Sequence, residues 1–322
     1  MKTYIIRRLL HMIPVLLGIS FLSFLLMELA PGDYLDTLRL NPQISAEQID
    51  KMRVQFALDR PWYVRYSHWL GNAATLNFGE SFQYRVPVTQ LIGDRLFNTF
   101  IVAFASTLFS WSIAIPLGVL AAIYKDSIFD RIAGFLAFAA LSLPELFLAL
   151  LALWVALATG LFPVGGLYGV DYDYLSPVGK ALDLLHHLIL PTLVLGIGGI
   201  ASLMRLMRGN FIETMRAEYV TSAKAKGLSD FAVYFKHVFR NAINPLITVF
   251  GYSLSGLLSG AFLVENVMSL PGLGRLTVEA FFAKDYYLVM ASVIMASVLL
   301  MVGNLLADIL LAAVDPRIRY DK

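Results

Sequence analysis

The sequence predicts an all-α membrane protein with six transmembrane helices. Its 322 residues are 58% hydrophobic and only 15% charged, and the mean hydropathy of +0.70 lies outside the range of soluble domains. Six apolar runs are long enough to cross a hydrocarbon core of roughly 30 Å. Runs of this length favour helices over barrel strands, because every backbone amide in lipid needs a partner within the protein. The six runs are Leu9 to Leu29, Thr99 to Tyr124, Ile132 to Leu161, Leu188 to Met204, Leu246 to Val264 and Tyr286 to Ala307.

The distribution of basic residues predicts how these helices are oriented. With a cytoplasmic N-terminus, 15 of the 25 Lys and Arg fall on the cytoplasmic side, whereas the short outer loops hold only Lys180, Arg275 and Lys284. The others lie in one outer loop that is too long to count in the positive-inside rule. Both termini are therefore expected in the cytoplasm. The net charge of +2 is too small to indicate nucleic acid as a partner.

The chain is expected to divide into four regions. Residues 1–30 form an N-terminal transmembrane anchor, which is retained because its apolar core is longer than that of a cleavable signal peptide and no small-x-small cleavage site follows. Residues 31–94 form a folded extracytoplasmic segment, with turns at Pro31-Gly32-Asp33 and Asn41-Pro42 and a helix opening at Ser45. Residues 95–313 carry the other five helices, and 314–322 form a cytoplasmic tail.

The polar, basic island between the fourth and fifth runs is the most distinctive part of the sequence. Within residues 215–245, which we call the elbow, the pattern predicts two short helices joined by a break. Met215, Tyr219 and Ala223 recur at steps of four, Gly227 can end that helix in a left-handed conformation, and Ser229 suits the N-cap of the next helix. An elbow held between two spans can be pushed by a partner protein.

The second helix of the elbow is predicted to be amphipathic. Lys236 and Arg240 fall on its polar side, and Pro245 marks where the helix bends or ends. The predicted apolar stripe consists of Phe231, Tyr234, Phe235, Val238 and Ala242.

Prolines and glycines within the spans predict bends and close contacts. Pro116, Pro144 and Pro191 each remove one backbone hydrogen bond and permit a kink. The small residues of the run Gly196, Gly198 and Gly199 are typical of helices that pack closely in a membrane.

Glu145 is an acid well inside the third run. An ion within the membrane is costly unless it faces a cavity or a partner. Two interpretations stay open for this residue. It either lines a translocation pathway or is a protonated or hydrogen-bonded packing residue that follows Pro144.

No catalytic, cofactor or metal site is expected in this chain. The sequence contains no GxxxxGK[ST] phosphate loop, no HExxH and no GxSxG. It also contains no Cys, which excludes thiolate nucleophiles and thiolate metal sites. Any work driven by ATP must therefore come from another subunit.

Four ordered motifs resemble one family over essentially the whole chain. They are YVTSAKAKGL, HVFRNAINPL, VENVMSLPGLGRL and DPRIRY, and the start IIRRLLHMIPVLLGISFLSFLLMELAPGD fits the same pattern. The chain resembles the permease subunits of bacterial ABC importers for peptides, nickel and related solutes. Among these it is similar to the first, B-type permease of dipeptide and oligopeptide systems. The resemblance implies the type I ABC importer transmembrane fold in the bacterial plasma membrane.

The resemblance also implies a role for the elbow. In the family, this loop is the cytoplasmic coupling segment that docks into a groove on the ATPase. Gly227, Phe231 and Phe235 are then expected to act as mechanical contacts. Thr221 and Ser222 depart from the Glu-Ala-Ala start of the broader signature, so an acidic contact is not expected there. The positions that match the family pattern are Ala223, Ala225, Lys226, Gly227 and Leu228, with Asn241 and Pro245 closing the second helix.

The resemblance implies three kinds of protein partner besides membrane lipid. They are a homologous second permease, two ATPase subunits that bind ATP and Mg²⁺, and an extracytoplasmic solute-binding protein. Closure of the ATPases is expected to turn the bundle from inward-open to outward-open. The solute is not specified, because relatives carry peptides, nickel, glutathione or oligosaccharides.

Two other functions are compatible with a helical membrane bundle. One is an ion-coupled secondary transporter that uses Glu145 as its coupling acid, although such carriers usually have several ionisable or broken-helix sites in two symmetric halves. The other is a scaffold or channel subunit without energised transport.

Overall fold

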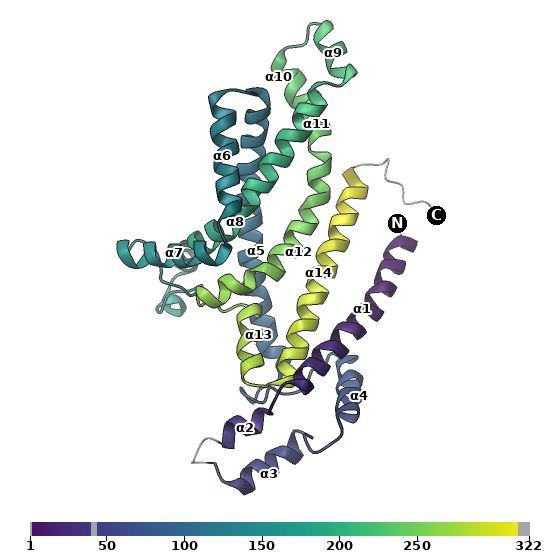
Figure 1. The fold of residues 1–322 in the computed structure, drawn as a ribbon, viewed down its shortest axis with the longest axis vertical. Coiled ribbons are helices and arrows are strands. Elements are labelled where there is room, and N and C mark those ends of the chain that lie inside the picture. The colour runs from purple at the N-terminus through teal and green to yellow at the C-terminus, as the bar shows by residue number, and fades with distance from the viewer. Residues whose placement is uncertain (1, 40–43, 315–322) are drawn as a thin grey trace. The chain divides into compact units, whose positions relative to one another are not determined.

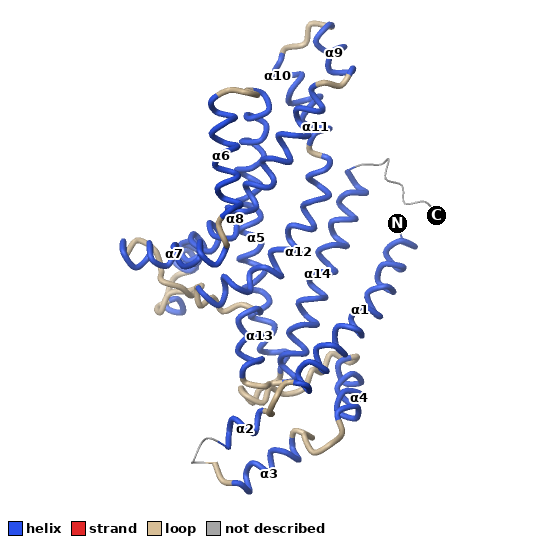
Figure 2. Tube along the Cα trace, in the orientation of Figure 1, coloured by secondary structure: helices blue, strands red, loops and turns tan. Residues whose placement is uncertain are grey.

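The computed structural model describes residues 2–39 and 44–314, and every regular element within them is helical (Figures 1 and 2). The side chains of 251–260 and of a few other residues lie outside this description. The elements are α1 (Lys2–Leu29), α2 (Tyr34–Arg39), α3 (Ala46–Gln55), α4 (Trp62–Ala73), α5 (Val88–Ile123), α6 (Ile128–Ser142), α7 (Glu145–Thr159), the 3-10 helix η1 (Tyr172–Tyr174), α8 (Pro177–Met215), α9 (Glu218–Ala225), α10 (Asp230–Ala232), the π-helix η2 (Val233–Val238), α11 (Phe239–Ala242), α12 (Asn244–Val267), α13 (Leu273–Phe282) and α14 (Tyr286–Val314).

Four of these helices are long and apolar enough to cross a membrane, counted over the described residues. They are α1, α5, α8 and α14, and they contain the first, second, fourth and sixth predicted runs. The fifth predicted run lies on α12, but it includes residues 251–260, whose side chains are outside the described set. The predicted turn at Asn41-Pro42 also lies outside the described residues.

The third predicted run is not one straight helix. α6 and α7 are bent by 97° at the break between them. Leu143 has an extended backbone, and Pro144 precedes the first residue of α7. Proline disfavours helical backbone in the residue before it and cannot donate a hydrogen bond to the preceding turn. The kink predicted at Pro144 is therefore a complete separation of two helices, and α6 with α7 can be counted as a fifth, broken span.

The chain divides into two compact units. Among the described residues, the bundle unit comprises Phe100–Leu270 and residues 300–314, and the N-terminal unit comprises residues 2–99 and Pro271–Leu299. Each is described by itself below.

The N-terminal unit is organised around a core of aromatic and aliphatic side chains. Phe24, Trp69 and Phe82 are buried within it. The helix predicted to open at Ser45 is confirmed as α3, with a capping box in which the Ser45 side chain accepts from the Gln48 backbone and the Gln48 side chain accepts from the Ser45 backbone.

A buried carboxylate ties the loop after α4 to the start of α14 within this unit. The Ser81 hydroxyl donates to Asp285 Oδ2 at 2.6 Å, and the Gln83 backbone N–H donates to the same oxygen at 3.1 Å. Burial raises the pKa of Asp285, and the hydrogen bond from Ser81 partly opposes that effect. The hydrogen bonds satisfy a polar group that would otherwise be costly to bury.

Within the bundle unit, α5 and α8 approach each other closely at two glycines. A Cβ atom added at Gly118 would lie 2.7 Å from the backbone oxygen of Met204. Gly196 faces the side chains of Phe109 and Ser110, and the Ser110 hydroxyl donates to the Gly196 carbonyl at 2.9 Å. The close packing predicted from the glycine run is thus confirmed at Gly196.

We predict opposite stability effects for two glycine substitutions in these helices. Gly118→Ala should lower the free energy of unfolding by about 1–3 kcal/mol, because the new methyl group meets backbone that cannot move aside. Gly209→Ala should raise it by roughly 0.5–1 kcal/mol, because a Cβ there meets nothing within 4 Å and alanine favours the helix. Thermal unfolding of the purified permease in detergent measures both. Shifts of the same sign and size would contradict this packing.

Candidate functional site

The elbow has two helical arms, as the sequence predicts. After α8 ends at Met215, Ala217 adopts an extended backbone and α9 begins at Glu218. The second arm consists of α10, η2 and α11, and it leads into α12 (Figure 1). The elbow is therefore a short helical insertion between the long helices α8 and α12.

The turn between the arms requires a glycine. Gly227 has a φ of +80°, a conformation that residues with a Cβ rarely adopt. The Gly227 N–H donates to the Lys224 carbonyl at 2.9 Å, and the Leu228 N–H donates to the Ala223 carbonyl at 3.4 Å. This pair of hydrogen bonds is the Schellman motif, which satisfies the last carbonyls of a helix. The predicted left-handed end at Gly227 is confirmed.

Side-chain contacts also stabilise the turn between the two arms. The Ser229 hydroxyl accepts from the Ala232 N–H at 3.3 Å and caps the second arm, as predicted. Lys224 forms an ion pair with Asp230 at 3.3 Å and lies 5.3 Å from the centre of the Tyr234 ring. The hydrogen bond to Asp230 raises the pKa of Lys224. These contacts hold the two sides of the turn together.

Asn241 joins the far ends of the two arms. Its side-chain amide donates to the Tyr219 hydroxyl at 2.9 Å and to the His237 carbonyl at 3.0 Å. Tyr219 belongs to α9 and Asn241 to α11. The two arms are thus connected at the turn and again at their base.

The inner face of the elbow packs against α5 and α8. Met207 and Phe211 of α8 lie in the same buried cluster, together with Val119 of α5. Because protein interiors are close-packed and barely compressible, this packing fixes the position of the elbow relative to these helices. The buried side chains on the elbow are Val220, Ala223, Val233, Val238 and Ala242.

The apolar faces predicted for the two arms of the elbow are partly wrong. Phe231 and Phe235 are exposed, and Val233, outside the predicted stripe, is completely buried. The cause is the π-helix η2, in which residues five apart, such as Val233 and Val238, share a face. A stripe counted at 3.6 residues per turn therefore misplaces the rings. Tyr219 is also exposed, because the break at Ala217 gives α9 its own orientation.

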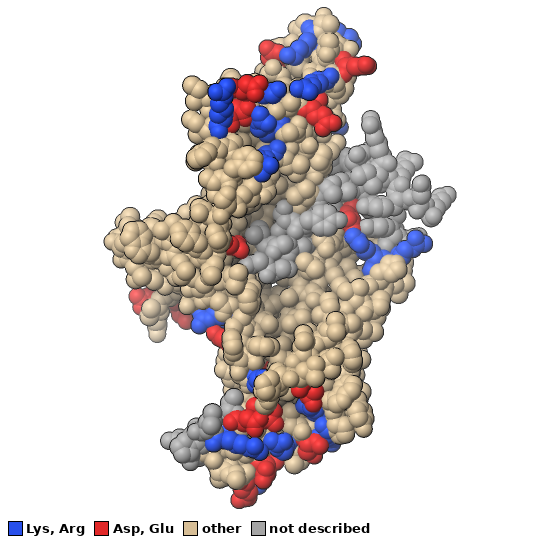
Figure 3. Space-filling model, viewed as in Figure 1, with Lys and Arg blue, Asp and Glu red and all other residues tan. Residues whose placement is uncertain are grey.

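The outer face of the elbow carries an exposed apolar surface. Leu228 is 43% exposed, Phe231 70% and Phe235 48%, and the two rings lie 4.7 Å apart. We call these three residues the docking patch. Figure 3 shows Lys and Arg side chains, with Asp and Glu among them, around the elbow and the α5–α6 turn. A cluster of exposed large apolar side chains with a charged rim is typical of a surface that binds another protein.

The other site residues predicted from the sequence fall in two groups. Ala225, Lys226 and Gly227 are exposed beside the docking patch. The second arm ends at Ala242 and Pro245 lies in the first turn of α12, where a proline has no hydrogen bond to lose, so the helix end predicted near Pro245 is confirmed.

Glu145 lies apart from the elbow. It is the first residue of α7 and is half-buried. It makes no hydrogen bond or ion pair with any residue that the structure describes. Among the described residues, no group of three His, Cys, Asp or Glu could hold a metal ion.

Two family models match the chain over nearly its whole length. Residues 114–320 match the binding-protein-dependent transport system inner membrane component, and residues 1–103 match the N-terminal part of the membrane component of such systems.

Curated relatives match from end to end. An oligopeptide transport system permease protein of Bacillus subtilis is 40% identical, over 99% of this chain and 100% of the relative. A putative peptide transport system permease protein of Brucella abortus is 37% identical over the full length of both. A glutathione transport system permease protein of Shigella flexneri is 34% identical, over 99% of this chain and 100% of the relative.

A solved structure shares the fold. The MetNI methionine ABC transporter, in an inward-facing conformation, matches with a TM-score of 0.56 at 16% identity, covering 70% of this chain and 97% of that one. The chain belongs to the inner membrane component family of binding-protein-dependent transport systems.

Proposed function

We propose that this chain forms half of the translocation pathway of an importer for peptides, and that its elbow couples this pathway to separate ATPase subunits. The observation that carries the second part is the two-sided elbow, which is buried against α5 and α8 on one face and presents exposed aromatic rings on the other. The peptide substrate is supported by the relatives from Bacillus and Brucella, which are named as peptide permeases.

Family membership establishes the general function of the chain. The chain is an inner membrane permease subunit of an ABC importer and is not itself an enzyme, since the ATPase resides in other subunits. It works with a solute-binding protein and an ATPase. The family gives no support to an ion-coupled transporter.

The proposal extends to the topology and the subunit composition of the importer. The proposed arrangement has six spans, with the termini and the elbow in the cytoplasm and residues 31–94 outside. It pairs the chain with a second, homologous permease and with two ATPase subunits that hold ATP and Mg²⁺. The basic residues around the elbow support this orientation, because positive charge favours the cytoplasmic side. Glu145, half-buried beside the break after α6, is proposed to line the pathway.

The mechanism is mechanical. The docking patch sits in a groove of the ATPase, and closure of the ATPase pair displaces the elbow. Two contacts connect the arms of the elbow, one from Lys224 to Asp230 and one from Asn241 to Tyr219. They limit the movement of one arm relative to the other. Because its inner face is packed on α5 and α8, the displacement is passed to those helices as a rigid-body movement.

Substitution of Gly227 tests the shape of the turn. Gly227→Val should uncouple ATP hydrolysis from uptake, because a β-branched residue at this φ costs about 1–3 kcal/mol. Gly227→Asn should retain coupling, because Asn tolerates the left-handed region and a Cβ there meets nothing within 4 Å. Uptake and ATP hydrolysis are measured together in proteoliposomes, with Gly209→Val as the control for a helical glycine. Normal uptake by Gly227→Val would contradict a role for this turn in coupling.

Truncation of the docking patch tests its contact with the ATPase. Phe231→Ala should weaken ATPase binding about tenfold or more, because buried aromatic anchors commonly contribute about 2 kcal/mol or more to an interface. The fold should survive, because the ring is exposed. Phe282→Ala removes a ring that is 75% exposed in α13 and serves as the control. Pull-down of the ATPase by each variant gives the comparison, and equal recovery from both would rule out the patch as the contact.

Glu145→Gln separates a pathway residue from an ion-coupling acid. The variant should keep uptake that depends on ATP and is insensitive to a proton ionophore, with a changed KM for the solute. Glu47→Gln, an exposed acid on α3, should leave KM unchanged. Loss of uptake when the proton gradient is collapsed in the wild type, with ATP present, would support ion coupling instead.

A further inference from the structure

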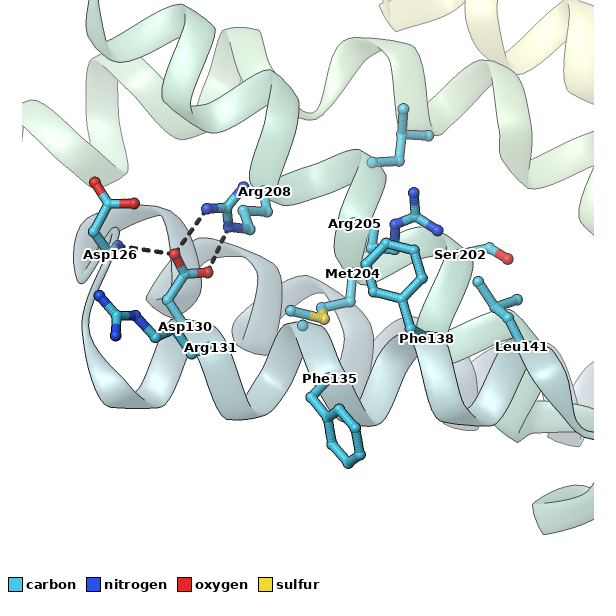
Figure 4. A pocket seen from close by; sticks show the side chains of 12 residues that line it. Asp126, Asp130, Arg131, Phe135, Phe138, Leu141, Ser202, Met204, Arg205 and Arg208 are labelled. Atoms are coloured by element: carbon cyan, nitrogen blue, oxygen red, sulfur yellow. Dashed lines mark hydrogen bonds and ion pairs between the residues drawn. The ribbon is translucent and has the colours of Figure 1, made fainter.

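A groove of about 950 Å³ lies between α6 and α8 in the bundle unit (Figure 4). The part near the α5–α6 turn is charged, with Asp126, Asp130 and Arg208 in its lining. The walls further along α6 are apolar and include Phe135 and Phe138. The groove is therefore amphipathic along its length.

Both carboxylates of the groove already have a cation. Arg208 donates two hydrogen bonds to Asp130, at 2.6 Å and 2.7 Å, and the Asp126 backbone N–H donates to Asp130 at 2.9 Å. Asp126 is paired with Lys125 at 3.7 Å. A bidentate pair of this kind fixes the position of both partners.

Two guanidinium groups of the groove remain uncompensated. Arg131 and Arg205 make no ion pair with any carboxylate in the part of the chain that the structure describes. The guanidinium carbon of Arg205 lies 4.2 Å from the centre of the Phe138 ring, as Figure 4 shows. Stacking on a ring stabilises the cation but does not neutralise it. The groove thus offers positive charge to an anion.

The dimensions of the groove match one leaflet of a bilayer. Asp130 and Leu141, which line it at different depths, are eleven positions apart on α6 and therefore roughly 16 Å apart along the helix axis. This is close to half of a hydrocarbon core of roughly 30 Å. Phe138 and Leu141 are exposed, as expected of side chains that meet an acyl chain.

We propose that this groove binds an anionic phospholipid of the cytoplasmic leaflet, with Arg205 contacting the phosphate, Arg131 attracting the headgroup from the rim and one acyl chain running from Phe138 toward Leu141. Basic pockets between transmembrane helices on the cytoplasmic side suit such headgroups. Assignment to that leaflet rests on the proposed orientation of the elbow. The guanidinium groups favour an anionic lipid over a zwitterionic one, because an attached amine would bring a second positive charge to the site.

The test measures the lipids retained by the assembled importer. The complex is purified in mild detergent from membranes that contain phosphatidylglycerol and phosphatidylcholine, and bound lipids are counted by native mass spectrometry. The wild type should retain phosphatidylglycerol in preference to phosphatidylcholine. The double variant Arg131→Gln with Arg205→Gln should retain at least about tenfold less phosphatidylglycerol than the wild type, because two charge-assisted contacts are lost. Arg205→Lys should fall between them, because lysine keeps the charge without the planar fork.

Lys180→Gln is the matched control. It removes one positive charge near the other end of α8 and should leave phosphatidylglycerol retention unchanged. A thermal midpoint equal to that of the wild type shows that each variant is folded.

Three results would overturn the proposal. The first is equal retention of phosphatidylglycerol by the wild type and the double variant. The second is equal retention of both lipids by the wild type. The third is retention of a peptide in place of lipid, which would assign the groove to the solute pathway. The assay needs no ATP and no solute. Lipid retention without coupling through the elbow would therefore refute the proposed function alone, and coupling without lipid retention would refute the lipid site alone.

Discussion

The packing of the elbow on α5 and α8 is the contact on which the rest of the mechanism depends. Val220, Val233 and Val238 are buried in it, against Met207 and Phe211. Each fully buried aliphatic side chain of this size contributes roughly 1.5–3 kcal/mol. A surface loop without such packing would absorb a push by changing its own shape. The elbow is instead packed against the helices on either side of it, as the proposed coupling requires.

The local structure of the elbow serves two opposed requirements. The inner face must be apolar to pack, whereas the proposed coupling needs Phe231 and Phe235 on the outer face, although their exposure to water is unfavourable. The π-helix η2 reconciles these requirements, because its wider turn places Val233 and Val238 inside while Phe235 stays outside. A regular α-helix with the same sequence would bring different side chains to the core.

Much of this arrangement could be predicted from the sequence, and the exceptions have physical causes. Helix capping depends on neighbouring residues, so the helix end at Gly227 and the helix start at Ser229 were predictable. The orientation of Phe231 was not, because a π-helix leaves no distinct signal in a short apolar pattern. The 97° break at Pro144 exceeds the kink expected of a proline, since its size depends on packing around α6 and α7. The pairing of Asp130 with Arg208 joins residues far apart in sequence, and no local pattern reveals it.

Cysteine crosslinking tests the central claim most directly, because the chain has no cysteine of its own. Phe231→Cys, in the assembled importer, should be joined to an ATPase subunit by a short bifunctional reagent. Val178→Cys, which is 70% exposed in the native chain near the start of α8, should not. A crosslink from Val178→Cys to the ATPase, or a crosslink from Phe231→Cys to the solute-binding protein alone, would contradict the account.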